Sequence, residues 1–215
     1  MQQFDNEGTF SGGHTHRRVL GQVVRLCLWC GIEPFFTPVY EAKRNDQVEN
    51  FHLIGVAGFW SRGTFVDLAH VQTEAALYGR WYHHHYRPPA LEGLTPAEVR
   101  RGQPIHKLSA ALRDLIPTGR LPLTRGRLHI MRKVNSAGDI HLLNDRWSVG
   151  RHWRGEYVRA TINTVTQQLT LWHQADEQAA WRRLKTRAFR LKEPVHALLP
   201  EFRRKCSRCL EQWPD

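Results

Sequence analysis

Two carboxylates in the first fifty residues, Asp5 and Glu49, are candidate ligands for a divalent metal ion. Asp5 follows a short segment typical of the end of a strand, and Glu49 falls in the first turn of a predicted helix, where the helix dipole favours an anion. Mg²⁺ prefers oxygen ligands, and two such ions about 3.5–4 Å apart would activate the attacking oxygen and stabilise the leaving oxygen of a phosphodiester. Spacing alone also allows a helix cap or a solvated charge at each position.

Positive charge is concentrated in the second half of the chain. The 215 residues include 31 Lys/Arg and 20 Asp/Glu, for a formal net charge of +11 at pH 7. Residues 1–99 carry 8 Lys/Arg against 10 Asp/Glu, whereas residues 100–215 carry 23 against 10. This asymmetry predicts that the second half binds a polyanion, and DNA is the expected partner because neutralising phosphates releases counterions. A well-solvated basic surface is the alternative.

Composition argues against several other classes of protein. Apolar residues make up 41% of the chain and eight residues are Trp, so a packed core is expected rather than wholesale disorder. No apolar run reaches the ~18–20 residues of a membrane span, so we expect a cytoplasmic protein that does not contact the membrane. Two C-x-x-C pairs, at residues 27–30 and 206–209, have the spacing of ligands in a four-cysteine zinc site. The first pair falls in a predicted apolar helix, where thiols pack as small hydrophobes, and this packing is the alternative.

Hydrophobic spacing predicts a mixed α/β first half. The pattern favours a helix over residues 16–29 that Gly31 ends, followed by an aromatic strand over residues 33–39. The two prolines of this strand favour a position at a sheet edge. Two further helices are predicted over about residues 46–60 and 67–86, and an Arg-Pro-Pro sequence ends the second.

The second half changes to a period of two after a proline-interrupted linker over residues 101–125. Five short strands are predicted in residues 126–173, and so many strands in so short a segment favour a small closed β-barrel. Its core is expected to hold Trp147, Trp153 and Trp172, with base or sugar stacking as the alternative role. Residues 174–215 are expected to form a basic, helical tail.

The order of several motifs in the first hundred residues resembles a known family. The motifs read FDNE at 4–7, GIEPF at 31–35, RNDQVENF at 44–51, WYHHHYRP at 81–88 and LEGLTPAE at 91–98. Together they resemble the integrase core, the ribonuclease-H-like catalytic domain of DDE-type insertion-sequence transposases and retroviral integrases. The predicted barrel is similar, more loosely, to the small DNA-binding barrel that follows this core in many such transposases.

The resemblance implies a DNA transposase or integrase that acts by metal-dependent phosphodiester transesterification. In the family, two aspartates and a glutamate on a later helix bind the metals. By resemblance Asp5 would be the second aspartate and Glu49 the glutamate, both holding Mg²⁺ or Mn²⁺. Only four residues precede Asp5, so we expect residues 1–100 to be an N-terminally truncated core that is inactive alone, with its first strands encoded upstream of Met1.

Basic side chains near these predicted elements are the candidate DNA contacts, where they would position phosphates. We expect most of the binding in residues 120–215, and by resemblance a homo-oligomer assembled on DNA. A non-catalytic DNA-binding remnant, or an oligomerisation partner of a full-length transposase, is the rival hypothesis. The candidate contacts are Arg17, Arg18, Lys43, Arg44, Arg127, Arg132, Lys133, Arg151, Arg154 and Arg159.

Overall fold

The chain forms two compact units, which we call the sheet unit and the helical unit. The sheet unit combines residues 1–42 with residues 115–215, and the helical unit consists of residues 43–114. No helix within the described ranges is long and apolar enough to cross a membrane. The computed structural model describes residues 2–4, 12, 17–38, 46–102, 114–176, 178–199 and 202.

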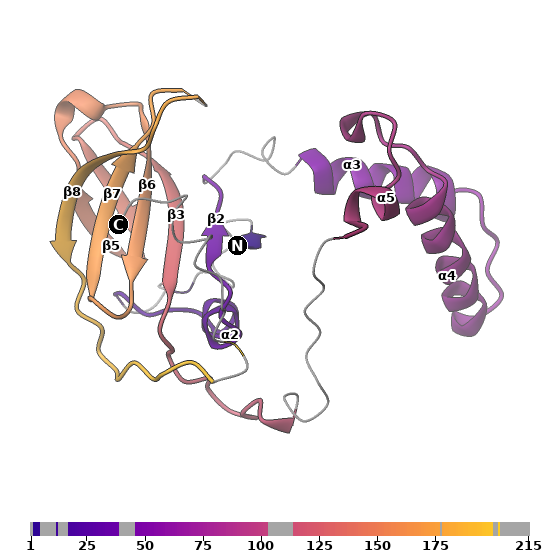
Figure 1. Cartoon of the computed structure of the whole chain (residues 1–215), viewed down its shortest axis with the longest axis horizontal. Helices are drawn as coiled ribbons and strands as arrows, with labels where there is room; N and C mark the ends of the chain where they lie inside the picture. Colours follow the sequence, from indigo (N-terminus) through magenta and orange to yellow (C-terminus); the bar gives the residue numbers. More distant parts are fainter. Residues whose placement is uncertain are drawn as a thin grey trace. The chain divides into compact units, whose positions relative to one another are not determined.

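Among the described residues, the sheet unit contains a six-stranded sheet in the order β1-β2-β3-β6-β7-β8 (Figure 1). β2 is parallel to both of its neighbours, whereas the later strands pair antiparallel. A separate antiparallel ribbon pairs β4 with β5. The elements of this unit are β1 (Gln2–Phe4), α2 (Gln22–Trp29), β2 (Pro34–Phe36), β3 (Arg127–Lys133), β4 (Asp139–Leu142), β5 (Asp145–Ser148), β6 (Tyr157–Asn163), β7 (Gln168–His173) and β8 (Arg182–Ala188).

One face of this sheet forms the hydrophobic core, because successive side chains of a strand point to opposite faces. The register aligns Ile130, Ala160 and Leu171 across β3, β6 and β7, and all three are fully buried. Helix α2 adds Val24 to the same core and the ribbon adds Ile140. The core therefore draws on the start of the chain and on its second half together.

A buried arginine fastens α2 to two distant segments of the sheet unit. Arg25 is only 1% exposed, and its guanidinium donates to the backbone oxygens of Leu20 (3.0 Å) and Leu121 (2.9 Å). It also forms a two-pronged ion pair with Glu193, with 2.9 Å between Nη1 and Oε2. Leaving a buried charge unpaired costs several kcal/mol, so these acceptors fix the position of α2.

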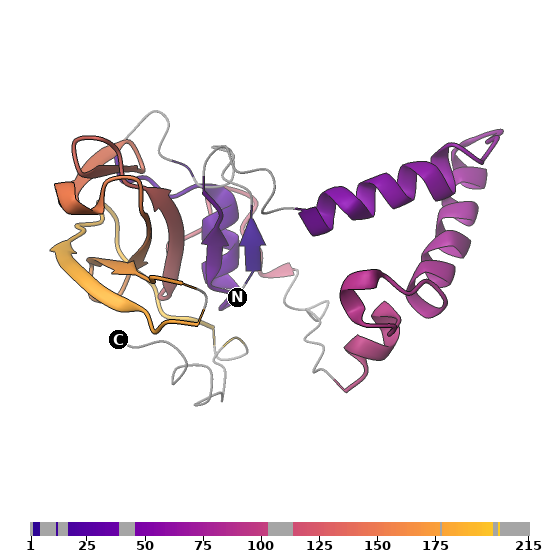
Figure 2. The ribbon, with the colours of Figure 1, turned by 90° about the horizontal axis from the view of Figure 1, so that it is seen from above.

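The helical unit is a helical hairpin followed by short turns (Figure 2). Its second long helix begins where the Asp67 carboxylate accepts a hydrogen bond from His70 N at 2.7 Å, and its last helix begins at a capping box between Thr95 and Glu98. The elements are α3 (Asp46–Gly55), the π-helical turn η2 (Val56–Trp60), α4 (Leu68–His84), the 3₁₀ turn η3 (Pro89–Leu91) and α5 (Pro96–Arg100).

The large apolar side chains of residues 49–102 in the helical unit are exposed or half-buried. Ring contacts join its two long helices, with 5.1 Å between the centroids of Phe51 and Tyr82 and 5.6 Å between those of Phe59 and Tyr78. No apolar side chain among residues 49–102 belongs to the buried hydrophobic core. The large hydrophobic residues that it exposes are Phe51, Leu53, Val56, Trp60, Val66, Leu68, Leu77, Trp81, Leu94 and Val99.

Most of the predicted elements are confirmed. Strands β3 to β7 occupy the five segments predicted in residues 126–173, and α3 and α4 lie where helical spacing placed them. Helix α2 begins later than predicted, at Gln22, because Arg18 has a φ of 60° that a right-handed helix does not allow. Gly31 ends this helix as predicted, with a φ of 66°.

Three features of the predicted fold are wrong. Among the described strands the sheet is open rather than a closed barrel, with β1 and β8 at its edges. The aromatic strand is internal, since β2 lies between β1 and β3, and Pro34 is tolerated as its first residue. Residues 182–188 form β8 instead of a helix, because the hydrogen-bonding groups of β7 offer them a strand partner.

The packing of β8 predicts a large effect of truncating Phe189, which follows this strand, is fully buried and stacks on Trp147 with 5.7 Å between ring centroids. We expect Phe189→Ala to lower the free energy of unfolding by about 3–5 kcal/mol, measured by urea denaturation. Val165→Ala, at a side chain that is 56% exposed, should change it by less than about 0.5 kcal/mol. An unchanged urea midpoint for Phe189→Ala would contradict the placement of β8.

Candidate nucleic-acid interface

The structure leaves the predicted metal ligands untested. Glu49 is exposed on α3, and Asp5 lies outside the described residues. Within the described ranges, no group of three or more His, Cys, Asp or Glu side chains is placed to hold a metal ion. The Asp5–Glu49 site with Mg²⁺ or Mn²⁺ therefore stays a prediction.

The first pair of cysteines is embedded in and beside α2. Cys27 is buried and Cys30 is half-buried. Burial, with a smaller contribution from Cys30, raises the pKa of the Cys27 thiol to about 11. Such a thiol stays protonated at neutral pH and packs as a small hydrophobe. Cys206 and Cys209, the second pair of the possible zinc site, lie outside the described residues.

Two of the predicted DNA contacts are ion-paired inside the sheet unit. Arg18 Nη2 lies 2.7 Å from the carboxylate of Asp145, and its guanidinium covers the Trp147 ring at 4.8 Å. Arg127 Nε lies 2.9 Å from Glu33 Oε1. Each of these arginines already has a carboxylate partner, so neither presents a free positive charge for a phosphate.

Two more of the arginines predicted to contact DNA, Arg132 and Arg159, form other contacts within the sheet unit. Arg132 donates to the backbone oxygens of His141 (3.0 Å) and Met131 (2.8 Å), and burial lowers its pKa to about 10. Arg159 is 2% exposed, and its guanidinium covers the ring of Trp181 at 4.0 Å. Burial, aided by the charge of Arg127, lowers the pKa of Arg159 to about 10, so it stays charged at neutral pH. This stacking is a cation–π contact within the sheet unit.

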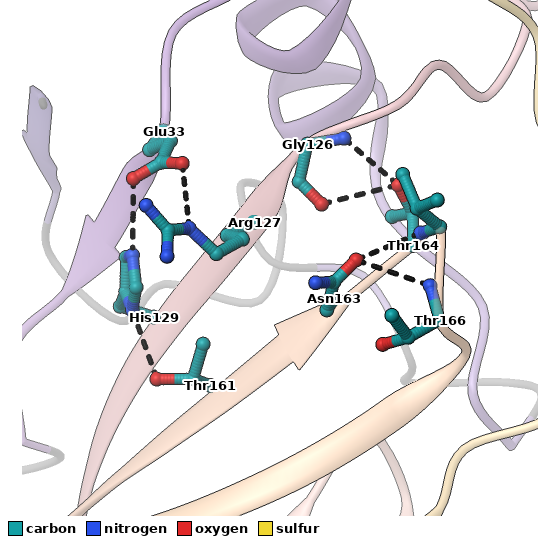
Figure 3. Close-up of polar contacts among 9 residues, drawn as sticks. Glu33, Gly126, Arg127, His129, Thr161, Asn163, Thr164 and Thr166 are labelled. Atoms are coloured by element: carbon teal, nitrogen blue, oxygen red, sulfur yellow. Dashed lines mark hydrogen bonds and ion pairs between the residues drawn. The ribbon is translucent and has the colours of Figure 1, made fainter. Parts of the chain in front are cut away.

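A polar network crosses the other face of the sheet, from β3 to the loop before β2 and to β6 (Figure 3). His129 Nδ1 lies 3.0 Å from Thr161 Oγ1, and its Nε2 lies 3.4 Å from Glu33 Oε2. Because a carboxylate only accepts hydrogen bonds, Nε2 carries the proton and Nδ1 accepts from the threonine hydroxyl. Burial lowers the pKa of His129, although Glu33 opposes this effect, so the imidazole is neutral at pH 7.

This hydroxyl–imidazole–carboxylate order is the arrangement that activates a nucleophile in some hydrolases. Here Thr161 is 8% exposed and His129 is 5% exposed, and both lie in the middle of the sheet. A reacting group needs access to the hydroxyl oxygen, and this burial denies it. The network is therefore structural, and it joins β6 and β3 to the segment that leads into β2.

The same view shows a second set of structural contacts at the end of β6 (Figure 3). The Thr164 hydroxyl accepts from Gly126 N at 2.9 Å and lies 3.1 Å from the backbone oxygens of Gly126 and Thr124. The Asn163 side chain accepts from the backbone N–H groups of Val165 and Thr166, which closes the turn into β7. These contacts hold the loop before β3 and the turn after β6 in place.

The remaining predicted contacts fall into two sets. Arg17, Lys133, Arg151 and Arg154 are exposed in the sheet unit, where they are accessible to a polyanion. Lys133 also lies over the Tyr157 ring at 5.4 Å. Lys43 and Arg44 lie outside the described residues.

Sequence reasoning missed the basic side chains of β8 and of the segment that follows it. Each is exposed or half-buried, and none forms an ion pair with a described carboxylate. The alternation of basic residues with Leu184, Thr186 and Ala188 was the available signal for a strand, but the expectation of a helical tail obscured it. These side chains are Arg182, Arg183, Lys185, Arg187, Arg190 and Lys192.

No protein-family model matches the chain, and no curated protein is significantly similar to it.

The Glu33 network predicts an acid-sensitive fold. Burial tends to raise the pKa of this carboxyl, but hydrogen bonds from His129 and Arg127, together with the charge of Arg127, lower it to about 2. Because the folded pKa lies below the unfolded value of about 4.3, the stabilisation is present above pH 4.3 and is lost as the pH falls towards 2.

Glu33→Gln should therefore reduce stability at pH 7 and flatten the decline of stability between about pH 4 and pH 2. Urea denaturation at a series of pH values measures both effects. Glu92→Gln is the matched control, because Glu92 is exposed and has no ion-pair partner among the described residues. The same pH dependence in Glu33→Gln and in the unsubstituted protein would show that the network does not stabilise the fold.

Proposed function

We propose that the chain binds duplex DNA through its sheet unit, as a DNA-binding component of a DDE-type transposase or integrase. The observation that carries this proposal is the division of charge between the units. Residues 115–199 carry 15 Lys/Arg against 6 Asp/Glu, whereas residues 46–102 carry 5 against 6. A polyanion is attracted to the first set and not to the second.

The exposed cations support DNA as the polyanion. Arg151, Arg154, Arg182 and Arg187 are all exposed, and none forms an ion pair with a described carboxylate. Free guanidinium groups match phosphate oxygens in geometry as well as in charge. Contacts of this kind depend on phosphates and not on bases, so the proposed binding has little sequence preference.

The order of elements at the start of the chain supports the resemblance to the integrase core. β1 and β2 are parallel, α2 connects them, and α3 with Glu49 follows. In the family, the second aspartate follows a strand and the glutamate lies on a later helix, which is the order of Asp5 and Glu49. The proposed function is DNA binding, which the cations of the sheet unit supply by themselves.

The helical unit supports self-association as its role. Its exposed apolar side chains border an open pocket of about 470 Å³ lined by Phe59, Phe65, Tyr78 and Trp81. Large exposed apolar surfaces mark contact sites. A second copy of the chain is the proposed occupant, because this unit is nearly neutral and two copies can meet here without the repulsion that separates two basic sheet units.

DNA binding is the first expected result. The full chain should bind a 20-base-pair duplex of arbitrary sequence, with an affinity that falls steeply as salt rises. Fluorescence anisotropy measures this binding, and replacing Mg²⁺ by EDTA at matched ionic strength should leave it unchanged. Binding that requires Mg²⁺ or Mn²⁺, together with cutting or joining of labelled DNA, would instead support the catalytic alternative.

Self-association through the helical unit is the second expected result. Light scattering of the full chain should show a dimer, and Leu53→Glu with Leu68→Glu should shift it towards monomer, because each buries a charge in the proposed contact. Leu53 is 68% exposed and Leu68 is 70% exposed, so the fold should tolerate both substitutions. Gln72→Glu adds one negative charge at another exposed position of α4 and is the control for each single substitution. A monomeric unsubstituted chain, or a dimer that survives the double substitution, would contradict this contact.

A further inference from the structure

We propose that the DNA backbone lies along the seam between β5 and β8, where Arg17, Arg146, Lys185 and Arg187 contact its phosphates. We call these four side chains the β5–β8 seam. The inference rests on the proposed function, since it names the surface that the DNA occupies. Arg17, Lys185 and Arg187 form no ion pair with a described carboxylate, and the one ion-pair contact of Arg146 among the described residues is with Asp139 at 3.5 Å.

Two sets of contacts bring β5 and β8 side by side. At one end, Trp147 of β5 stacks on Phe189, which follows β8, and Arg18 covers both rings at 4.8 and 5.7 Å. At the next residue of β5, Lys185 Nζ lies 3.5 Å from the backbone oxygen of Ser148. The end of β5 therefore lies against β8 and the residue that follows it.

The register of β8 directs its cations to this seam. Lys185 lies opposite Leu171, and Arg187 lies opposite Leu169. Cross-strand partners share a face of the sheet, so both cations lie on the face where the core and the ribbon pack. Phe189, the next residue on this side after Arg187, is fully buried beneath Trp147.

Positive charge along the seam is not cancelled by its neighbouring carboxylates. Asp145 already pairs with Arg18 at 2.7 Å. Asp139 lies 3.5 Å from Arg146, but this guanidinium is 71% exposed, so the pair is weak in water. Arg17 is exposed beside Arg18, and Arg187 is exposed without an ion-pair partner among the described residues. Arg17 and Arg187 therefore keep an uncompensated charge for the phosphates of a DNA strand, and Arg146 keeps most of its charge exposed.

The side chains around the seam favour duplex DNA over two other polyanions. Single-stranded DNA binds through stacking on exposed aromatic rings, but Trp147 and Trp172 are buried in this unit. Attachment to an anionic membrane surface uses exposed apolar side chains that insert among the lipids. Among the described residues of 139–192, the one large hydrophobic side chain that is more than a third exposed is Val165, in the turn after β6.

The test compares two triple variants of the full chain that remove the same charge. R146Q/K185Q/R187Q alters the seam, and R62Q/R80Q/R100Q alters exposed arginines of the helical unit. Binding to a 20-base-pair duplex is measured by anisotropy between about 50 and 200 mM salt. The seam variant should bind on the order of tenfold more weakly, and its slope of log affinity against log salt should be shallower by about 2–3. The helical control should change the affinity less than about twofold.

Further variants and ligands distinguish the possible reasons for a negative result. R146K/R187K keeps the charge and should restore most of the affinity, which excludes misfolding as the cause of a loss; unfolding midpoints check the same point. If the unsubstituted chain fails to bind duplex DNA, the proposed function is wrong. If it binds but the two triple variants lose equal affinity, the seam is not the contact surface. Tighter binding to oligo(dT), or to vesicles of phosphatidylserine and phosphatidylcholine, than to the duplex would also overturn the inference.

Discussion

The parallel pairing of β2 with β3 is the constraint on which the sheet unit depends. It places Phe36 beside Ile130, and both are fully buried. The pairing brings α2 over the core and sets Glu33 against Arg127, although these two residues lie 94 positions apart. Arg25 then holds α2 through Glu193, near the other end of the described chain. Without these contacts the apolar face of the later strands would lack part of its cover, so residues before and after the helical unit must fold together.

Arginine has two separate roles in this unit, and its surroundings decide which one each residue takes. Where a carboxylate or an aromatic ring is within reach, as Asp145 is for Arg18 and Trp181 is for Arg159, the guanidinium is part of the fold. Where the neighbours are strand edges and exposed turns, as around Arg187, the charge faces solvent. The first group accounts for much of the packing between distant segments. The second group supports the proposed attraction to DNA, since only an uncompensated charge releases counterions when it meets a phosphate.

Local patterns in the sequence were sufficient to predict most helices and strands, but not which strands pair with one another. The Thr95–Glu98 capping box and the alternation in residues 126–173 depend on neighbours in the chain, so the corresponding helix and strands could be predicted. The internal position of β2 and the formation of β8 depend on which distant strand has free backbone groups, which no local pattern records. For the same reason the sequence did not separate Arg127, which Glu33 neutralises, from Arg187, which is exposed. Asp5 and Glu49 were chosen by resemblance, and the described residues leave that choice untested.

The central claim is that the sheet unit holds the DNA while the helical unit does not. Hydrogen–deuterium exchange of the full chain, with and without saturating duplex DNA, tests it most directly because one experiment reports on both units. The account predicts slower exchange on DNA binding in peptides that cover residues 145–154 and 182–192, and no change in peptides that cover residues 67–86. Protection confined to residues 46–102, with none along β5 or β8, would contradict it.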